Sequence, residues 1–306
     1  MKFFSQRKAL VIPGFALLSL LLSPVYACAQ AEDAGQTTAQ EITGRKDEQT
    51  DKSVRRHKDQ DQSQNPAEIT AVPNRPTFST TAEAVQRGVL EVEYGVELAD
   101  GHQNINGLIK FGVFKNLELR FANNPLERDD GRGGWGDSGA GFKYRIISQQ
   151  RALPTFSVLY TASLSTSTGS PGIGAMGHGV DLLVSKDFGK HHFDFNEGVR
   201  FLGRPHVGGY DRNYFTAFDY AHPLSGKWGY TVELAGFSRA NAATPATMIV
   251  LLAATYNVSP RLVLDGGEYT AAYGNLPRVT FFLGVTYAIA DLYRAHRAVS
   301  TASRKP

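Results

Sequence analysis

Residues 89–98, which read VLEVEYGVEL, alternate apolar and polar side chains almost one by one. Because successive side chains of a β-strand point to opposite faces, this text predicts a strand with one apolar and one acidic face. In a soluble sheet the apolar face packs on a core, whereas in a membrane barrel it meets lipid and the acidic face lines a wet lumen. The apolar face holds Leu90, Val92, Tyr94, Val96 and Leu98, and the acidic face holds Glu91, Glu93 and Glu97.

The same alternation recurs through residues 76–290. We count about twelve segments of roughly ten residues with this period, separated by Gly, Asn, Asp, Ser or Pro. The segment ATMIVLLAATY, residues 246–256, is apolar on both faces and fits a wet lumen least well. The pattern predicts an all-β, transmembrane, antiparallel up-and-down barrel of about twelve strands.

The links between these segments alternate in length. Short links at residues 114–116, 148–152 and 189–191 follow even-numbered segments, and longer ones at residues 123–137 and 167–179 follow odd-numbered segments. Outer-membrane barrels have short periplasmic turns and longer extracellular loops, so both barrel termini are expected in the periplasm. The first link, residues 99–102, is a short exception. The alternative, a secreted soluble β protein with inverted faces, has no reason to sort its loops in this way.

The N-terminal text predicts a secretory signal peptide over residues 1–29. A basic start precedes an apolar run, and Ala27 and Ala29 flank Cys28 in an A-x-A arrangement. Cleavage before Gln30 would remove the only cysteine. In the alternative reading Cys28 is acylated as in a lipoprotein. Either route exports the chain.

Composition divides the rest of the chain. Residues 30–75 are mostly polar with mixed charge, which predicts a disordered periplasmic leader. Residues 76–290 form the predicted barrel, and residues 291–306 a polar tail. The whole chain has a formal charge of only +3 and 42% hydrophobic residues. It can therefore bury a sizeable core, and nucleic acid is not a favoured partner.

Few motifs point to catalysis or cofactor binding. Gly172, Gly174 and Gly177 match G-x-G-x-x-G, but the text after them predicts a strand rather than the helix that a dinucleotide needs. GDSGAG, residues 136–141, is similar to serine-protease text but has no suitable base and partner. His191 and His192 are neighbours with poor metal-ligand geometry. We predict no cofactor, no metal and no catalytic residue, and keep a lipid-modifying outer-membrane enzyme as an alternative.

Four stretches carry a family resemblance: NRPTFSTTAEAVQRGVLEVEYGVE, GLIKFGVFKNLELRF, GWGDSGAGFKYRI and LPTFSVLYTASLSTSTG, within about residues 74–290. They resemble the outer-membrane barrel family named for the meta pathway of phenol degradation. The resemblance implies a transporter of small compounds, aromatic or otherwise hydrophobic, in the outer membrane of a Gram-negative-type cell. It also implies membrane lipid and the barrel-assembly machinery as partners. The chain departs from the usual pattern by continuing past Tyr287, so its assembly signal would be read internally.

Inward-facing charged residues form the candidate site of a passive channel. Opposite charges on facing strands should pair across the lumen. Such residues can screen permeants, hold the barrel together, or do both, and a closed structural or interaction barrel is a further alternative. Asp181, Asp219 and Asp265 are expected beside them. The candidate lumen-lining residues are Glu91, Glu93, Glu97, Lys110, Glu118, Arg120, Lys143, Arg145, Asp194, Arg200, Glu233 and Arg278.

Overall fold

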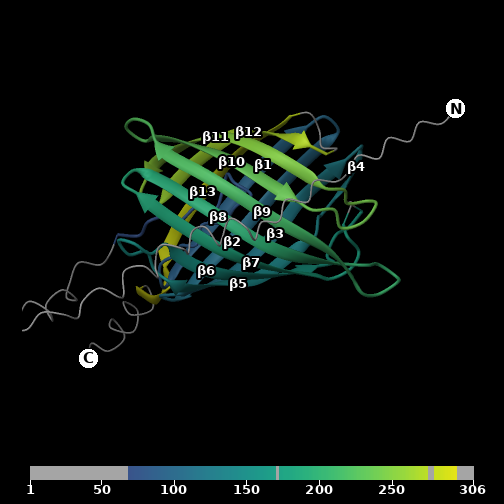
Figure 1. Cartoon of the computed structure of the whole chain (residues 1–306), viewed down its shortest axis with the longest axis horizontal. Helices are drawn as coiled ribbons and strands as arrows, with labels where there is room; N and C mark the ends of the chain where they lie inside the picture. The colour runs from purple at the N-terminus through teal and green to yellow at the C-terminus, as the bar shows by residue number, and fades with distance from the viewer. Residues whose placement is uncertain (1–67, 170–171, 275–278, 295–306) are drawn as a thin grey trace, which may run out of the picture. The chain divides into compact units, whose positions relative to one another are not determined.

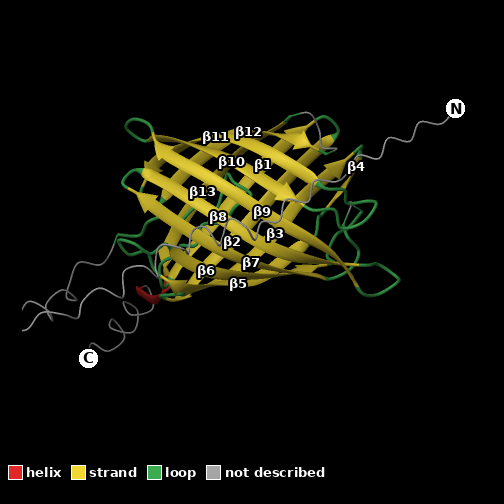
Figure 2. Ribbon diagram, in the orientation of Figure 1, coloured by secondary structure: helices red, strands yellow, loops and turns green. Residues whose placement is uncertain are grey.

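The computed structural model describes residues 68–169, 172–274 and 279–294. Their strands form an antiparallel barrel and are tilted relative to its axis (Figures 1 and 2). The strands are β1 (Val89–Ala99), β2 (His102–Phe114), β3 (Leu117–Asp129), β4 (Arg132–Gly134), β5 (Ser138–Ile147), β6 (Thr155–Leu164), β7 (Gly177–Phe188), β8 (His191–Gly203), β9 (Tyr210–Pro223), β10 (Trp228–Phe237), β11 (Thr247–Ser259), β12 (Leu262–Tyr273) and β13 (Thr280–Asp291).

The last strand closes the sheet onto the first. β13 pairs with β1 from Val89 opposite Asp291 to Leu98 opposite Phe281, and β2 pairs with β3 to complete the ring. Of the 13 strands, β4 pairs with β3 alone, so twelve form the closed wall. The predicted all-β, antiparallel barrel of about twelve strands is confirmed. Closure leaves no free sheet edge in the wall, which is a requirement for strands in a bilayer.

The short strand β4 differs from the sequence prediction. Residues 123–137 were expected to be a loop, but β3 continues to Asp129 and turns through Asp130 and Gly131, with φ of 47° and 81°, into β4. This hairpin extends beyond the part of β3 that pairs with β5, where the sequence is rich in charge and glycine. A strand that extends beyond the membrane interior needs no alternation of apolar and polar side chains. The two-residue pattern in the sequence therefore did not predict β4.

The barrel has a short-turn end and a long-loop end. Links at residues 115–116, 189–190 and 260–261 lie at the short-turn end, and those at residues 130–137, 204–209 and 238–246 lie at the long-loop end. Short turns also occur at the long-loop end, at residues 100–101 between β1 and β2 and at residues 130–131 between β3 and β4. β1 begins and β13 ends at the short-turn end, because the two strands are antiparallel neighbours.

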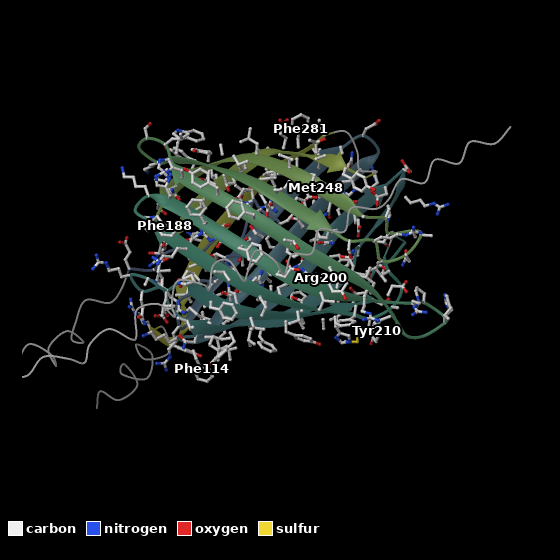
Figure 3. The ribbon with its side chains drawn as sticks, in the orientation of Figure 1. Phe114, Phe188, Arg200, Tyr210, Met248 and Phe281 are labelled. Carbon is white, nitrogen blue, oxygen red and sulfur yellow. The ribbon has the colours of Figure 1, made fainter. Side chains whose placement is uncertain are left out.

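The outer wall is apolar and the inner wall is polar. Leu98, Phe281 and Leu283 are 52%, 58% and 66% exposed, whereas Glu91 and Lys110 are fully buried. Phe114 and Phe281 point away from the barrel (Figure 3). Large apolar side chains on the outside and buried charges inside are the arrangement of a membrane barrel. The orientation predicted for residues 89–98 is confirmed.

No helix among the described residues is long and apolar enough to cross a membrane.

β11 has apolar side chains on both faces. Met248, Val250 and Leu252 point outward and are exposed, and Leu251 and Ala253 point inward and are buried. The lumen is therefore not polar all round, because at β11 its wall is a hydrophobic patch.

We predict that Leu252→Arg destabilises the barrel in lipid vesicles by roughly 2–4 kcal/mol, the cost of a charged side chain on the lipid face near mid-membrane. Denaturant titration of the vesicle-inserted barrel measures this. Val207→Arg, in an exposed link between β8 and β9, is the matched control and should change stability by less than about 0.5 kcal/mol. Equal stability of the two variants would contradict a lipid-facing β11.

Candidate functional site: the barrel lumen

Residues 68–87, here called the luminal segment, run inside the barrel before β1 begins. They contain no described helix or strand, and they hydrogen bond to inward-facing side chains of strands on opposite sides of the wall. The sequence placed residues 68–75 in a disordered leader, whereas the structure attaches them to the wall. Residues 30–67 of that leader, and the predicted signal peptide, lie outside the described residues.

Buried carboxylates accept the backbone N–H groups of the luminal segment. Glu91 Oε2 accepts from Val72 at 2.8 Å, and Glu93 accepts from the backbone of Asn74 and Arg75 at 3.0 Å each. Farther along, Glu118 Oε2 accepts from the backbone of Val85 at 2.9 Å. An irregular segment has no ladder to use its N–H groups, and an unpaired one inside the barrel would cost about 1–3 kcal/mol. The acidic face of β1 thus fixes the path of the segment.

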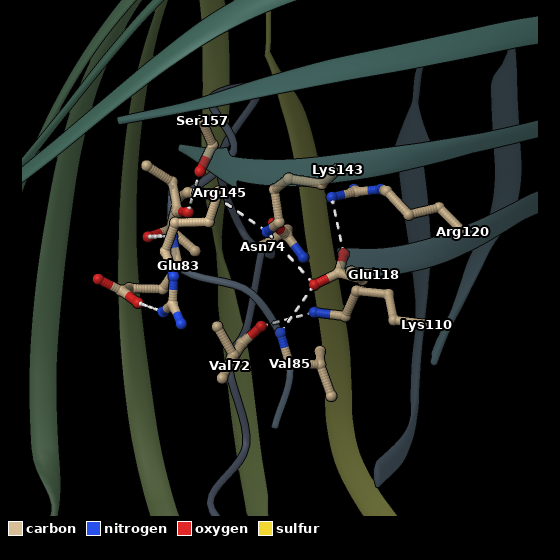
Figure 4. A network of polar contacts seen from close by, with 12 residues as sticks. Val72, Asn74, Glu83, Val85, Lys110, Glu118, Arg120, Lys143, Arg145 and Ser157 are labelled. Carbon is tan, nitrogen blue, oxygen red and sulfur yellow. Dashed lines mark hydrogen bonds and ion pairs between the residues drawn. The ribbon is translucent and has the colours of Figure 1, made fainter. Parts of the chain in front are cut away.

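Lysines from the wall neutralise these carboxylates. Lys110 Nζ lies 2.6 Å from Glu91 Oε1, pairs also with Glu93, and donates to the carbonyl of Val72 at 2.5 Å. Lys143 Nζ lies 3.5 Å from Glu118 and donates to the Thr81 carbonyl at 3.1 Å. Figure 4 shows Lys110 beside Val72 and Lys143 beside Glu118. Each lysine therefore joins a carboxylate of the wall to a carbonyl of the segment.

Neutral side chains hold the far side of the segment. Ser185 Oγ accepts from the backbone of Ala82 at 2.7 Å, and Ser157 donates to the Ala82 carbonyl at 2.5 Å. Asn196 accepts from Thr80 N at 2.7 Å and donates to Thr80 O at 3.0 Å. A carboxylate also takes part, because Glu233 accepts from Phe78 N at 2.8 Å and from Ser79 N at 2.5 Å. The segment is therefore attached around the circumference of the lumen.

Gly112 lets the segment rejoin the wall. A Cβ atom there would collide with the carbonyl oxygens of Val85 and Gln86. With no side chain in the way, Gly88 N donates to Gly112 O at 2.6 Å, and the chain continues into β1. Substitution of Gly112 would force the segment away from β2.

An aromatic cluster surrounds Phe78 at the centre of the segment. Its ring meets Tyr269 edge-on at 5.1 Å between centroids and Phe237 at 6.2 Å. Phe282 and Phe215 extend the cluster along the wall. Together with Leu251 and Ile249 of β11 they form one apolar sector of the lumen, with Phe78 docked on it.

Two cavities flank Phe78. The larger, about 300 Å³, is bordered by Arg120, Asn106, Tyr269 and Phe282, and the smaller, about 160 Å³, by Arg200 and Phe215 among others. Along β3, Arg120 lies nearer the long-loop end than Glu118. The larger cavity therefore extends from the segment toward that end.

The structure places the candidate residues at different levels. Arg278 lies outside the described residues. Arg145 pairs with Glu83 of the segment at 2.5 Å, and Asp194 bonds to Ser185 and His192. Glu97, Arg120 and Arg200 border the cavities. The residues in direct contact with the segment are Glu91, Glu93, Lys110, Glu118, Lys143, Arg145 and Glu233.

Several functional residues were missed from the sequence. Ser157, Ser185 and Asn196 bind the segment although none is charged. Phe78 is the first aromatic residue after the predicted signal peptide, in text that is otherwise polar. That isolation is the signal that could have identified it.

The motifs considered for catalysis have other roles. Ser138 of GDSGAG begins β5, and its hydroxyl accepts from Thr166 at 3.0 Å. Gly177 of the G-x-G-x-x-G text begins β7, so a strand follows the glycines. No cluster of three or more His, Cys, Asp or Glu side chains in the described part of the chain has metal-binding geometry.

Solved structures with a similar fold are outer-membrane barrels. The NanC porin aligns over 65% of this chain and all of its own length, with 10% identity and a TM-score of 0.50. An outer membrane channel from Pseudomonas putida F1 aligns over 74% of this chain and all of its own, with 13% identity and a TM-score of 0.50. No protein-family model matches the sequence, and neither does any curated protein. The likeness is one of fold.

We predict that Lys110→Met releases the luminal segment, since it leaves Glu91 and Glu93 buried without their lysine. Removing one partner of a buried ion pair typically costs about 3–5 kcal/mol. Denaturant titration should show this loss, and chymotrypsin should cut after Phe78, whose ring packs against Tyr269 and Phe237 inside the wild-type barrel.

Lys115→Met, in an exposed turn, is the matched control and should behave as wild type. The triple variant Lys110→Met, Glu91→Gln, Glu93→Gln should recover part of the stability, because no uncompensated charge remains. A Lys110→Met barrel as stable and as protected as the wild type would refute the assigned role.

Proposed function

We propose that this protein is a passive outer-membrane channel for small compounds, entered from the long-loop end. The observation that carries the proposal is a closed barrel with an apolar exterior whose lumen contains two cavities lined by both charged and aromatic side chains. A barrel that only anchored a soluble partner would not need such cavities. Twelve strands also give a lumen intermediate between filled eight-stranded barrels and open sixteen-stranded porins.

The luminal segment makes this channel closed at rest. It crosses the lumen at the level of Lys110 and Glu233, on the short-turn side of the larger cavity. Passage therefore requires displacement of the segment, at least over residues 78–82. The neutral contacts to Ser185, Ser157 and Asn196 are the ones that can break without separating buried charges.

The finer identity follows the sequence resemblance. The resemblance to the family named for the meta pathway of phenol degradation suggests that the permeants are small aromatic or hydrophobic compounds. The apolar sector around Phe78 offers such compounds a contact surface. Export by the N-terminal signal peptide and insertion by the barrel-assembly machinery belong to the same proposal. The fold supports the channel itself, since the two similar solved structures named above are a porin and an outer membrane channel.

Conductance of the purified, folded barrel in planar bilayers tests this proposal. We predict discrete steps that a disulfide between the luminal segment and the wall abolishes. Thr81 Oγ1 and Ser185 Oγ lie 3.2 Å apart, so Thr81→Cys with Ser185→Cys in a Cys28→Ser background is placed to form that bond. Steps should disappear on oxidation and return with a reductant.

Each single-cysteine variant is a matched control and should conduct in both redox states. Steps that persist in the oxidised double variant would show that solutes bypass the segment. Silence of the reduced double variant and of the wild type, in barrels shown to be folded, would overturn the channel and favour a closed structural barrel.

A further inference from the structure

The two cavities share one composition, although different strands build them. The larger cavity is lined by Arg120 and Asn106 together with Tyr269 and Phe282. In the smaller cavity Arg200 lies beside Phe215, with 5.1 Å between the guanidinium carbon and the ring centroid. Phe78 borders both cavities. Each cavity thus combines a guanidinium with aromatic rings.

Arg120 has N–H donors that no contact within the described part of the protein uses. Within the described residues its one hydrogen bond runs from Nη1 to Glu118 Oε1 at 3.3 Å. Its side chain is 10% exposed, and none of its nitrogens is buried without a partner. A guanidinium carries five N–H donors, so those not used by Glu118 open onto the cavity. Glu118 is itself shared with Val85 N and Lys143.

The carboxylates of the same cavity are already engaged. Glu93 accepts from Asn74 and from Arg75 N and pairs with Lys110. Glu97 accepts from Asn106 at 2.5 Å and from the Tyr269 hydroxyl at 3.4 Å. Arg75 also borders the cavity, but it donates to Asn106 and lies 3.4 Å from Asp265. Both arginines therefore keep N–H donors that these contacts do not use. They differ in charge balance, because Asp265 pairs with Arg75, whereas Glu118, the partner of Arg120, is shared with Lys143. Arg120 is the guanidinium of this cavity whose charge is only partly balanced.

We propose that the larger cavity is a binding site for a small aromatic carboxylate, with Arg120 holding the carboxylate and the rings of Tyr269 and Phe282 holding the aromatic ring. A planar guanidinium matches a carboxylate with two parallel N–H···O bonds. The rings provide edge-to-face or offset contacts for a ring in the permeant. A neutral hydrocarbon would leave the donors of Arg120 unused.

The smaller cavity is not assigned the same role. Arg200 is paired with Asp181 and lies over Phe215, so its charge is already compensated. The inference rests on the proposed function, because it names the class of compound that the channel would select. Its test measures binding alone, so that it can succeed or fail separately from conduction.

The test is equilibrium binding of benzoate and of its neutral analogue benzamide to the full-length folded barrel in detergent, by calorimetry. Benzoate should bind the wild type more tightly than benzamide. Arg120→Gln should weaken benzoate about tenfold or more, the usual value of a hydrogen bond to a charged group, and change benzamide by less than about twofold. Arg120→Lys should retain part of the preference.

Two further variants separate the charge from the ring contacts and from folding. Phe282→Leu keeps an apolar side chain but removes the ring, and it should weaken benzoate and benzamide alike. Arg132→Gln, in the exposed β4 hairpin, is the matched control and should leave both affinities unchanged. Heat-modifiable migration on gels confirms that each variant is folded.

Equal affinity of the wild type for the two probes, or unchanged benzoate affinity in folded Arg120→Gln, would overturn the site. If that happens in a barrel that conducts ions, the channel proposal stands and only the site fails. Arginine-dependent benzoate binding in a barrel that never conducts would support the site and overturn the channel.

Discussion

The interior of this barrel is organised by one requirement: the N–H groups of a segment without regular secondary structure must find acceptors inside a closed wall. Glu91, Glu93, Glu118 and Glu233 supply those acceptors. Buried carboxylates are themselves costly, and Lys110 and Lys143 offset that cost while also bonding to carbonyls of the segment. Wall and segment are thus satisfied only together, which is why a polar stretch of chain takes a defined path.

The lumen is divided into sectors by the same strands that make the wall. The side bounded by β1, β2, β3 and β5 carries the paired charges, and the side bounded by β9 to β13 carries the aromatic and aliphatic side chains around Phe78. A compound in the larger cavity would meet both sides. This division explains why β11 is apolar on its inner as well as its outer face.

The sequence was informative where structure is periodic and local. The alternation of polar and apolar residues, as at Glu91 and Val92, identified the strands, their faces and the approximate strand count. It is a strong signal because a shift of one residue along a strand would turn every side chain to the opposite face of the wall. It was uninformative where partners are distant in the chain. Phe78 and Ser79 bond to Glu233 across a separation of about 155 residues, and no local pattern records such a contact. Residues 68–75 read as disordered because their acceptors belong to strands that come later in the sequence.

The attachment of the luminal segment is uneven, and this has a mechanical consequence. Its two flanks meet buried ion pairs, at Lys110 with Glu91 and Glu93 and at Lys143 with Glu118. The stretch between them relies on amide and hydroxyl contacts, on Glu233, and on the ring of Phe78. Moving a flank separates paired charges in a low-dielectric interior. Moving the middle breaks amide and hydroxyl hydrogen bonds, removes two backbone donors from Glu233, and withdraws one ring from an apolar surface. The middle is therefore the part that moves at the lower cost, and it is also the part that borders both cavities.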